Sequence, residues 1–266
     1  MATERSANLR LRGAVEFSVS EILRGAVGLS INDRLKEALL PAWLYYGQKI
    51  AKEARKMEPE LRILRDLVPA SRTAIDVGAN RGYYSYALSQ IARRVEAFEP
   101  HPDLARFARK KLGRKAHVHE VALSNRAGTA TLYIPQLKHG IDVHYGSSLK
   151  RVYHDLAPTF VEITVRTATL DEFAFDDVGF IKIDVEGSDM DVIEGGRKTI
   201  ARDRPTMIVE LVAITHADPL ACVEHIKKTF RYDARIMVGS RLVDAQAALQ
   251  KPPQAWGTFN VVFTPK

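Results

Sequence analysis

The alternation of short apolar runs with segments of helical periodicity predicts an α/β protein. Runs rich in β-branched and apolar residues at 73–77, 94–98 and 117–123 have the length and composition of strands. Between them, residues 83–92 and 102–112 carry apolar side chains at the spacing of a helix. A β-α-β-α-β order of this kind predicts a parallel sheet that helices cover on both faces.

The same alternation continues towards the end of the chain. The elements predicted there are strands at 129–134, 160–166, 180–183, 205–211, 231–238 and 258–263, and helices at 189–199 and 220–229. The last strand is expected to be antiparallel. The sequence Thr169-Leu-Asp-Glu172 has the pattern of a capping box and predicts a helical turn. A polar stretch at 135–153 interrupts the alternation, and loops of this length inside a domain are usually functional or mobile.

Residues 1–70 are predicted to form an N-terminal helical extension, and residues 71–266 the main domain. Helical patterns run over 42–57 and 60–67, and another helix is expected to start near residue 30. Tyr45 and Tyr46 could cover a ligand as a lid, although packing against the main domain is favoured. No catalytic chemistry is expected from this extension.

The composition is that of a globular protein, and the cysteine content suits a reducing compartment without proving one. The chain has 266 residues, of which 46% are hydrophobic and 27% are charged. Its single cysteine, Cys222, excludes an intramolecular disulfide and a cysteine-rich zinc cluster. No apolar run reaches the length of a membrane span, so no membrane insertion is expected. No secretory signal is evident near the N-terminus, and a cytoplasmic location is therefore predicted.

The net charge is positive, which favours an anionic partner or reflects an ordinary solvated basic surface. The formal charge is +7 and the isoelectric point is near 9.4. The basic residues are spread along the chain, with Lys110-Lys111 and Arg114-Lys115 as the densest group. Because no aromatic-interleaved motif accompanies them, nucleic-acid binding is disfavoured without being excluded.

The first candidate site is the turn between the strand at 73–77 and the helix after it. Gly78, Asn80 and Gly82 tolerate positive φ, and glycine allows close backbone approach. The helix that follows presents unsatisfied N–H groups and the positive end of its dipole. Since open α/β sheets bind ligands at such turns, a ligand is expected here.

Residue spacing favours S-adenosylmethionine over a dinucleotide at this turn. Dinucleotide sites read G-x-G-x-x-G, whereas this chain has Asp76-x-Gly78-x-x-x-Gly82. The negative carboxylate of Asp76 beside the turn would disfavour a pyrophosphate ligand. A sulfonium ligand with an amino-acid tail can accept a carboxylate at this position. Glu99, at the end of the next strand, could accept hydrogen bonds from a ribose diol, as it could in a nicotinamide enzyme. A Walker phosphate loop is excluded because no G-K-[ST] follows, and a turn without ligand remains an alternative.

A second motif, Phe180-Ile-Lys-Ile-Asp-Val-Glu-Gly187, lies further along the chain. Together with Ile75 to Ser85, Ala97-Phe-Glu-Pro100 and Phe259-Asn-Val-Val-Phe263, it makes the chain resemble the FkbM-type methyltransferases. Three other segments match in the same order: Val121-Ala-Leu-Ser124 with the Gly128 turn, Gly146-Ser-Ser-Leu149 and Thr169-Leu-Asp171. The resemblance covers about residues 73–264. It implies a Rossmann-like, doubly wound, seven-stranded sheet with one antiparallel strand, and S-adenosylmethionine-dependent methyl transfer, mostly to hydroxyl oxygens of sugars or secondary metabolites.

The resemblance also implies roles for particular residues. The set that would bind the cofactor is Asp76, Gly78, Ala79, Asn80, Gly82, Tyr83, Glu99, Pro100, Val121 and Ala122. Within it, the residues of the glycine turn would surround the methionine moiety, Glu99 would hold the ribose, and Val121 and Ala122 would flank the adenine. The chain departs from the family at Ser188-Asp189, where a small residue and a glutamate are frequent.

Asp184 and Glu186 are the predicted catalytic residues, because the carboxyl ends of strands face the ligand crevice in such sheets. A hydroxyl acceptor needs a base, and either carboxylate could instead cap the next helix or pair with Lys182. His139 and His144, in the long polar stretch, titrate in the useful range but are more often surface residues. Asp184, Glu186 and Asp189 could gather around a metal, but residues two apart on a strand point to opposite sides, so no metal is predicted.

The sequence therefore predicts an O-methyltransferase that acts on a carbohydrate or another small-molecule acceptor. The alternatives are a methyltransferase for RNA or protein, a cofactor-binding protein without catalysis, and an NAD-dependent oxidoreductase. Neither the acceptor nor the oligomeric state follows from the sequence.

Overall fold

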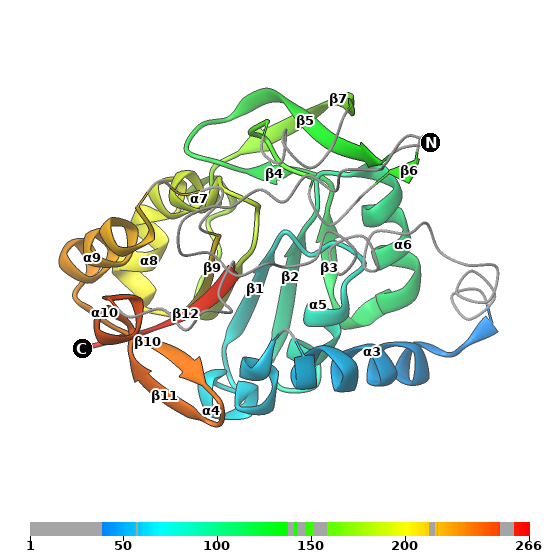
Figure 1. Ribbon diagram of the computed structural model, residues 1–266. Helices are drawn as coiled ribbons and strands as arrows, with labels where there is room; N and C mark the ends of the chain where they lie inside the picture. Colours follow the sequence, from blue (N-terminus) through cyan, green and yellow to red (C-terminus); the bar gives the residue numbers. More distant parts are fainter. Residues whose placement is uncertain are drawn as a thin grey trace, which may run out of the picture.

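The computed structural model describes residues 39–56, 58–137, 141–142, 147–151, 159–212, 216, 218–250 and 258–266. Its centre is an eight-stranded sheet in the order β11-β10-β12-β9-β8-β1-β2-β3 (Figure 1). In chain order, the strands are β1 (Thr73–Val77), β2 (Arg94–Phe98), β3 (His117–His119), β8 (Val178–Ile183), β9 (Thr206–Val212), β10 (Tyr232–Val238), β11 (Arg241–Asp244) and β12 (Thr258–Pro265).

The prediction of seven strands with one antiparallel strand was wrong at one edge of this sheet. Strands β3, β2, β1, β8 and β9 are parallel to one another, and β12 runs antiparallel between β9 and β10, as expected for the last strand. The additional strand is β11, which turns back at Gly239 and pairs antiparallel with β10. It is short and mostly exposed, so it lacks the apolar run by which strands are recognised in a sequence.

A second, four-stranded sheet lies beyond the carboxyl ends of the central strands (Figure 1). Its strands, in the order β4-β7-β5-β6, are β4 (Ala122–Leu123), β5 (Gly128–Leu137), β6 (Ile141–Asp142) and β7 (Thr159–Ala168). The single strand predicted over 117–123 is therefore two strands. The chain leaves the central sheet after His119, and Ala122 and Leu123 pair with β7 instead.

Helices cover both faces of the central sheet (Figure 1). The helical segments are α3 (Ala42–Lys56), η1 (Pro59–Arg62), α4 (Leu64–Leu67), α5 (Tyr83–Leu88), α6 (Pro102–Leu112), η2 (Gly113–Lys115), η4 (Leu170–Phe173), α7 (Asp189–Gly195), α8 (Arg197–Asp203), α9 (Pro219–Phe230) and α10 (Ala245–Gln250). One hydrophobic core joins the sheet to α7, α8, α9 and α10, and another joins it to α3, α4, α5 and α6. Within the described ranges, no helix has the length and apolar content needed to cross a bilayer.

Two predicted helices are each divided into shorter pieces. The helix expected at 189–199 is α7 followed by α8, and the break falls at Gly195 and Gly196. A Cβ atom on Gly195 would lie 2.0 Å from the carbonyl oxygen of Ser124, so this glycine permits a close approach to the loop after β4. The segment 60–67 is η1 and α4. The capping box at Thr169 and Glu172 is present as predicted and starts η4.

The described part of the N-terminal extension packs against the main domain. Tyr46 is fully buried, and its ring stacks on that of Tyr86 at 4.9 Å between centroids. Its hydroxyl donates a hydrogen bond to the carbonyl oxygen of Arg81, at 2.8 Å. Packing, the favoured role of this tyrosine, is confirmed. The helix start expected near residue 30, and His139 and His144, lie outside the described residues.

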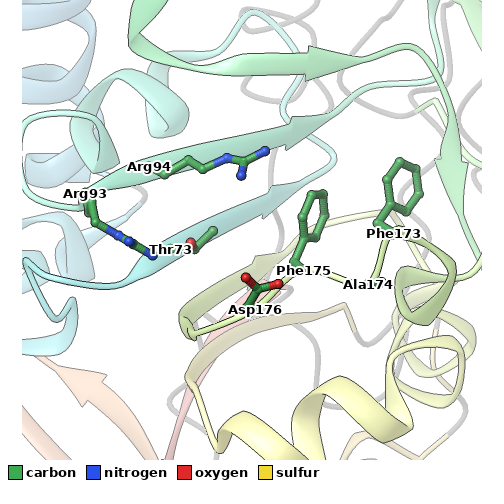
Figure 2. A pocket seen from close by; sticks show the side chains of 7 residues that line it. All are labelled: Thr73, Arg93, Arg94, Phe173, Ala174, Phe175 and Asp176. Carbon is green, nitrogen blue, oxygen red and sulfur yellow. The ribbon is translucent and has the colours of Figure 1, made fainter.

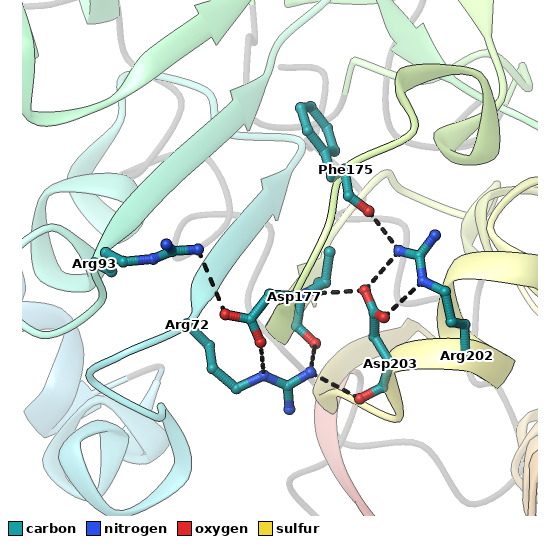
Figure 3. A network of polar contacts seen from close by, with 7 residues as sticks. Arg72, Arg93, Phe175, Asp177, Arg202 and Asp203 are labelled. Carbon is teal, nitrogen blue, oxygen red and sulfur yellow. Dashed lines mark hydrogen bonds and ion pairs between the residues drawn. The ribbon is translucent and has the colours of Figure 1, made fainter.

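A network of charged groups connects the amino ends of β1 and β8 through ion pairs and hydrogen bonds (Figure 3). The Nε atom of Arg72 lies 2.7 Å from Asp177 Oδ1, and its Nη2 atom donates to the carbonyl oxygens of Val178 and Asp203. Arg202 pairs with the carboxylate of Asp203, which also accepts from the Val178 N–H at 2.9 Å. These contacts join the start of two central strands to the end of α8.

Candidate active site at the carboxyl ends of the strands

The turn after β1 has the backbone conformation that its glycines predict. The φ angles of Gly78, Asn80 and Gly82 are 82°, 51° and 81°. The N–H groups of Gly78 and Ala79 both donate to the carbonyl oxygen of Phe98, at 3.0 and 2.9 Å, and this holds the turn against the end of β2. A Cβ atom on Gly78 would lie 1.8 Å from the carbonyl oxygen of Asp184. Glycine is therefore required here by the approach of the loop after β8, whatever ligand the turn binds.

Glu99 lies directly beside this turn, at the end of β2. Its Oε2 atom accepts from the Asn80 N–H at 2.7 Å, and its Oε1 atom accepts from the His101 N–H at 2.8 Å. The side chain is buried, and burial raises its pKa to about 7 against the two backbone hydrogen bonds. A carboxylate has about four acceptor positions, so each oxygen can accept a further hydrogen bond.

Asp76 is buried beneath the turn. Its carboxylate accepts a hydrogen bond from Ser85 Oγ of α5 at 2.5 Å. Burial raises the pKa of Asp76 to about 6, although the bond to Ser85 opposes this change. The residue thus connects the end of β1 to the first turns of the following helix.

The other predicted cofactor residues border the same edge of the sheet. Ala79 is buried in the turn, and Pro100 is half-buried directly after Glu99. Val121 and Ala122 are both buried where the chain passes from β3 to β4. The hydroxyl of Tyr83 donates to Glu58 Oε1, which no sequence pattern indicated.

Lys182 and Asp184 form the centre of a buried charged group at the end of β8. The ammonium group of Lys182 lies 3.5 Å from Asp184 Oδ2 and donates to Asn260 Oδ1 at 3.0 Å. Burial opposes the charge of Asp184, but the attraction of Lys182 together with the hydrogen bonds from Glu210 and Lys182 outweighs it and holds the pKa of the carboxyl group below its usual value. Asp184 is therefore ionised at neutral pH.

Glu210 is a member of this group that the sequence analysis missed. It follows Val209, which pairs with Ile183, so it lies across from Asp184 in the second half of β9. Burial and the charge of Asp184 raise the pKa of Glu210 well above its usual value, and the two carboxyl groups are hydrogen bonded. A protonated Glu210 thus donates to an ionised Asp184. The register of two adjacent central strands could have indicated this residue.

Glu186 joins Asp184 and Glu210, whereas Asp189 does not. Carboxylate oxygens of the first three residues lie within 4.8 Å of one another, and together they could hold a hard divalent cation. The expectation that Asp184 and Glu186 point apart was wrong, because β8 ends at Ile183 and strand alternation no longer applies. Asp189 instead accepts from the Val185 and Gly187 N–H groups, at 3.2 and 3.1 Å, and burial raises its pKa to about 7.

The N-terminal extension contributes acidic groups to this region, and the sequence analysis did not indicate them. Glu58 is buried and its pKa is raised to about 7, mainly by burial and against the attraction of Lys182. Glu60 is also buried, and one of its carboxylate oxygens accepts from the side-chain amide of Asn260 at 3.4 Å. Both residues precede the recognisable motifs, and only tertiary packing brings them to the ends of the strands.

The comparison with family models decides the family of the chain. The model of the methyltransferase FkbM domain matches residues 76–221, which is more than half of the chain. The chain belongs to the FkbM methyltransferase family. A curated relative, the 2-O-methyltransferase NoeI of Sinorhizobium fredii (strain NBRC 101917 / NGR234), is 27% identical over 189 residues, which are 64% of this chain and 77% of the relative.

Solved structures of other methyltransferases match this chain at lower sequence identity. The crystal structure of methyltransferase FkbM from Methylobacillus flagellatus KT has a TM-score of 0.48 and 15% identity. The match covers 92% of this chain and 58% of that chain, so this chain spans little more than half the length of that protein. The O-methyltransferase from Bacillus cereus, solved in complex with SAH, has a TM-score of 0.41 and 14% identity over 88% of this chain and 96% of that chain.

Proposed function

We propose that this FkbM-family methyltransferase transfers a methyl group from S-adenosylmethionine to a hydroxyl oxygen of a sugar or another small metabolite. The observation that carries the proposal is the position of the Asp184 carboxylate, which lies beside Lys182 and across from Glu210 at the carboxyl edge of the sheet. The name of the relative NoeI, a 2-O-methyltransferase, supports an oxygen acceptor. Residues 71–266 would form the methyltransferase domain, and residues 1–70 its extension.

Glu99 and the turn after β1 fit the proposed cofactor. The buried carboxylate of Glu99 has acceptor positions left for the two hydroxyl groups of a ribose, and its backbone contacts fix its orientation. The residues around it that would complete the cofactor site are Asp76, Gly78, Ala79, Asn80, Gly82, Tyr83, Pro100, Val121 and Ala122. When bound, the cofactor supplies the electrophilic methyl group.

In the proposed reaction, Asp184 removes the proton from the acceptor hydroxyl while the oxygen–carbon bond forms and the sulfur–carbon bond breaks. Base assistance of this kind typically contributes about 10²–10⁴-fold. Lys182 keeps Asp184 ionised, and the hydrogen bond from Glu210 orients it. Glu186 lies in the same carboxylate group and is the second candidate for the base. The remaining requirement is alignment of the acceptor oxygen with the breaking bond, which positioning supplies.

Cofactor binding is tested by calorimetry with S-adenosylmethionine and S-adenosylhomocysteine. We expect Glu99→Gln to weaken binding by about tenfold to a hundredfold, because an amide offers one acceptor oxygen in place of two and loses charge-assisted bonds. Glu120→Gln is the matched control, since that side chain is exposed and pairs with Arg109 instead. Equal affinity of the Glu99 variant and the wild type contradicts the assignment of the ribose site.

The chemical step is tested by measuring S-adenosylhomocysteine formation with a panel of hydroxylated sugars as acceptors. We expect Asp184→Asn to lower kcat by about 10²–10⁴-fold with cofactor affinity nearly unchanged, because the amide cannot take the proton. Glu186→Gln provides the comparison within the same carboxylate group. If both variants keep the wild-type kcat, neither residue is the base.

A further inference from the structure

Away from the proposed active site, two histidines and a glutamate converge on the edge of the central sheet. Glu96 of β2 is paired in register with His117 of β3, and His119 follows two residues later on the same face of that strand. His119 Nε2 lies 2.6 Å from Glu96 Oε2, and His117 Nδ1 lies 3.3 Å from the same oxygen. One donor atom from each residue lies within 4.8 Å of the other two.

We propose that Glu96, His117 and His119 bind a first-row transition metal, for which Zn²⁺ is the natural probe. Two imidazole nitrogens and one carboxylate oxygen form a ligand set that zinc, cobalt and nickel accept. Magnesium and calcium prefer oxygen ligands alone, so they should bind weakly here. This site is separate from the carboxylate group at Asp184, which contains no histidine and would favour a hard cation.

The environment of the three residues holds two of the ligands in place. The side chain of Glu96 is fully buried, and the Nε atom of Arg94 binds its other oxygen, Oε1, so that Oε2 remains directed towards the histidines. The ring of His119 stacks on Phe98 at 4.6 Å and meets the edge of Phe173 at 5.0 Å between centroids. Such outer contacts orient metal ligands and support their affinity.

The distances are compatible with coordination after a small movement. Ligands at about 2.1 Å from a tetrahedral zinc ion lie about 3.4 Å apart. His117 already satisfies this distance from Glu96, and His119 must move away from it by less than about 1 Å. His117 has a side chain that is 68% exposed, so the ion can enter from solvent on that side.

A cavity lies next to the site and shares Arg94 and Phe173 with its surroundings. It has a volume of about 210 Å³ and is lined by Thr73, Arg93, Arg94, Phe173, Ala174, Phe175 and Asp176 (Figure 2). Arg94 belongs both to the cavity wall and to the surroundings of Glu96, while the rings of Phe173 and Phe175 stack at 5.4 Å. Three protein ligands leave a fourth position for water or for a small ligand.

The test is calorimetric titration of the full chain with zinc chloride, repeated with magnesium chloride. We expect one Zn²⁺ to bind at this site, and we expect any Mg²⁺ binding to be unaffected by His117→Ala because magnesium would favour the separate carboxylate group at Asp184. We expect His117→Ala to weaken zinc binding by at least tenfold, because it removes one of three ligands, and to leave the fold intact because that side chain is exposed. The matched control is His225→Ala, since His225 Nε2 lies 3.2 Å from the half-exposed Glu194 and belongs to neither group of possible metal ligands among the described residues.

Cobalt substitution gives an independent readout. Co²⁺ at the site should show visible ligand-field bands without the thiolate charge-transfer band that binding at Cys222 would produce. A His117→Ala variant with wild-type zinc affinity, or a cobalt spectrum with thiolate character, overturns the proposal. Loss of zinc affinity in the His225 variant equal to that in the His117 variant overturns it as well.

Discussion

Charged side chains are paired at the amino ends of the central strands, whereas buried acidic groups are in excess at the carboxyl ends. At the amino ends, basic and acidic side chains pair with one another and with backbone groups, and most of them are partly exposed. The residues of this network are Arg72, Arg93, Asp177, Arg202 and Asp203 (Figure 3). The side-chain hydrogen bond from Arg202 holds the pKa of Asp203 below its usual value.

At the carboxyl ends, acidic groups outnumber the cation that is buried with them. Burial raises the pKa values of Glu58, Asp76, Glu99 and Asp189. Lys182 is the buried cation in this group, as far as the described residues extend. Charges that are poorly compensated cost folding free energy, and perturbed pKa values of this kind gather at functional sites. The amino ends therefore serve mainly stability, and the carboxyl ends retain groups that a reaction can use.

The largest expected effect on stability comes from removing the buried cation. Lys182→Met leaves the buried Asp184 without its positively charged partner, and we expect the free energy of unfolding at neutral pH to fall by about 3–5 kcal/mol. Urea denaturation measures this change. Arg72→Met at the opposite ends of the strands is the control, and we expect it to cost only about 1–2 kcal/mol because the side chains of Arg72 and Asp177 are partly exposed. Equal losses would remove the contrast between the two ends.

The next largest effect concerns the close approach of the turn after β1 to the loop after β8. Gly78→Ala adds a methyl group 1.8 Å from the carbonyl oxygen of Asp184 at a φ of 82°. We expect a loss of roughly 2–4 kcal/mol from strain and overpacking. Gly113→Ala is the control: its φ is 57°, but nothing lies within 4 Å of the added Cβ, and about 1 kcal/mol is expected. Thermal unfolding of both variants gives the difference.

The free energy of unfolding should also depend on pH in opposite directions for the carboxyl groups at the two ends of the strands. A carboxyl group with a raised pKa binds its proton more tightly in the folded state, so its stabilisation is present at low pH and is lost as the pH rises through the folded pKa. The free energy of unfolding should therefore fall between about pH 5 and pH 8, the window set by Glu58, Asp76, Glu99 and Asp189.

Glu58→Gln should reduce this fall by about 1–3 kcal/mol, whereas Glu120→Gln, an exposed carboxyl group, should leave it unchanged. Urea denaturation at several pH values measures the slope. The lowered pKa of Asp203 acts with the opposite sign, because its contribution is lost only as the pH falls into the acid range. A stability that rises from pH 5 to pH 8 would contradict the prediction.

The smallest effect is expected at the exposed part of the network at the amino ends. Asp177→Asn removes ion pairs with Arg72 and Arg93, but the Asp177 side chain is 45% exposed. We expect a loss of about 0.2–1 kcal/mol that decreases further with added salt. A loss above about 2 kcal/mol would contradict this prediction, because the network at the amino ends would then contribute to stability as strongly as a buried charged group.

Local sequence patterns predicted the elements that carry the cofactor turn. The strand β1, the positive φ of Gly78 and Gly82, and the position of Glu99 at the end of β2 were all accessible, because each depends on a few neighbouring residues. The break between α7 and α8 was only partly visible. Its glycine pair was noted, but the contact of Gly195 with Ser124 depends on a distant loop.

The sequence by itself determined the α/β class, the motifs of the FkbM family and the catalytic candidates Asp184 and Glu186. These follow from periodicity and from residues that are close in the chain. Tertiary structure alone brought Glu58 and Glu210 to Lys182, and placed Glu96 against the histidines of β3. Strand register and helix packing join residues that are far apart in sequence, and the burial that results changes their pKa values. No local pattern encodes those two effects.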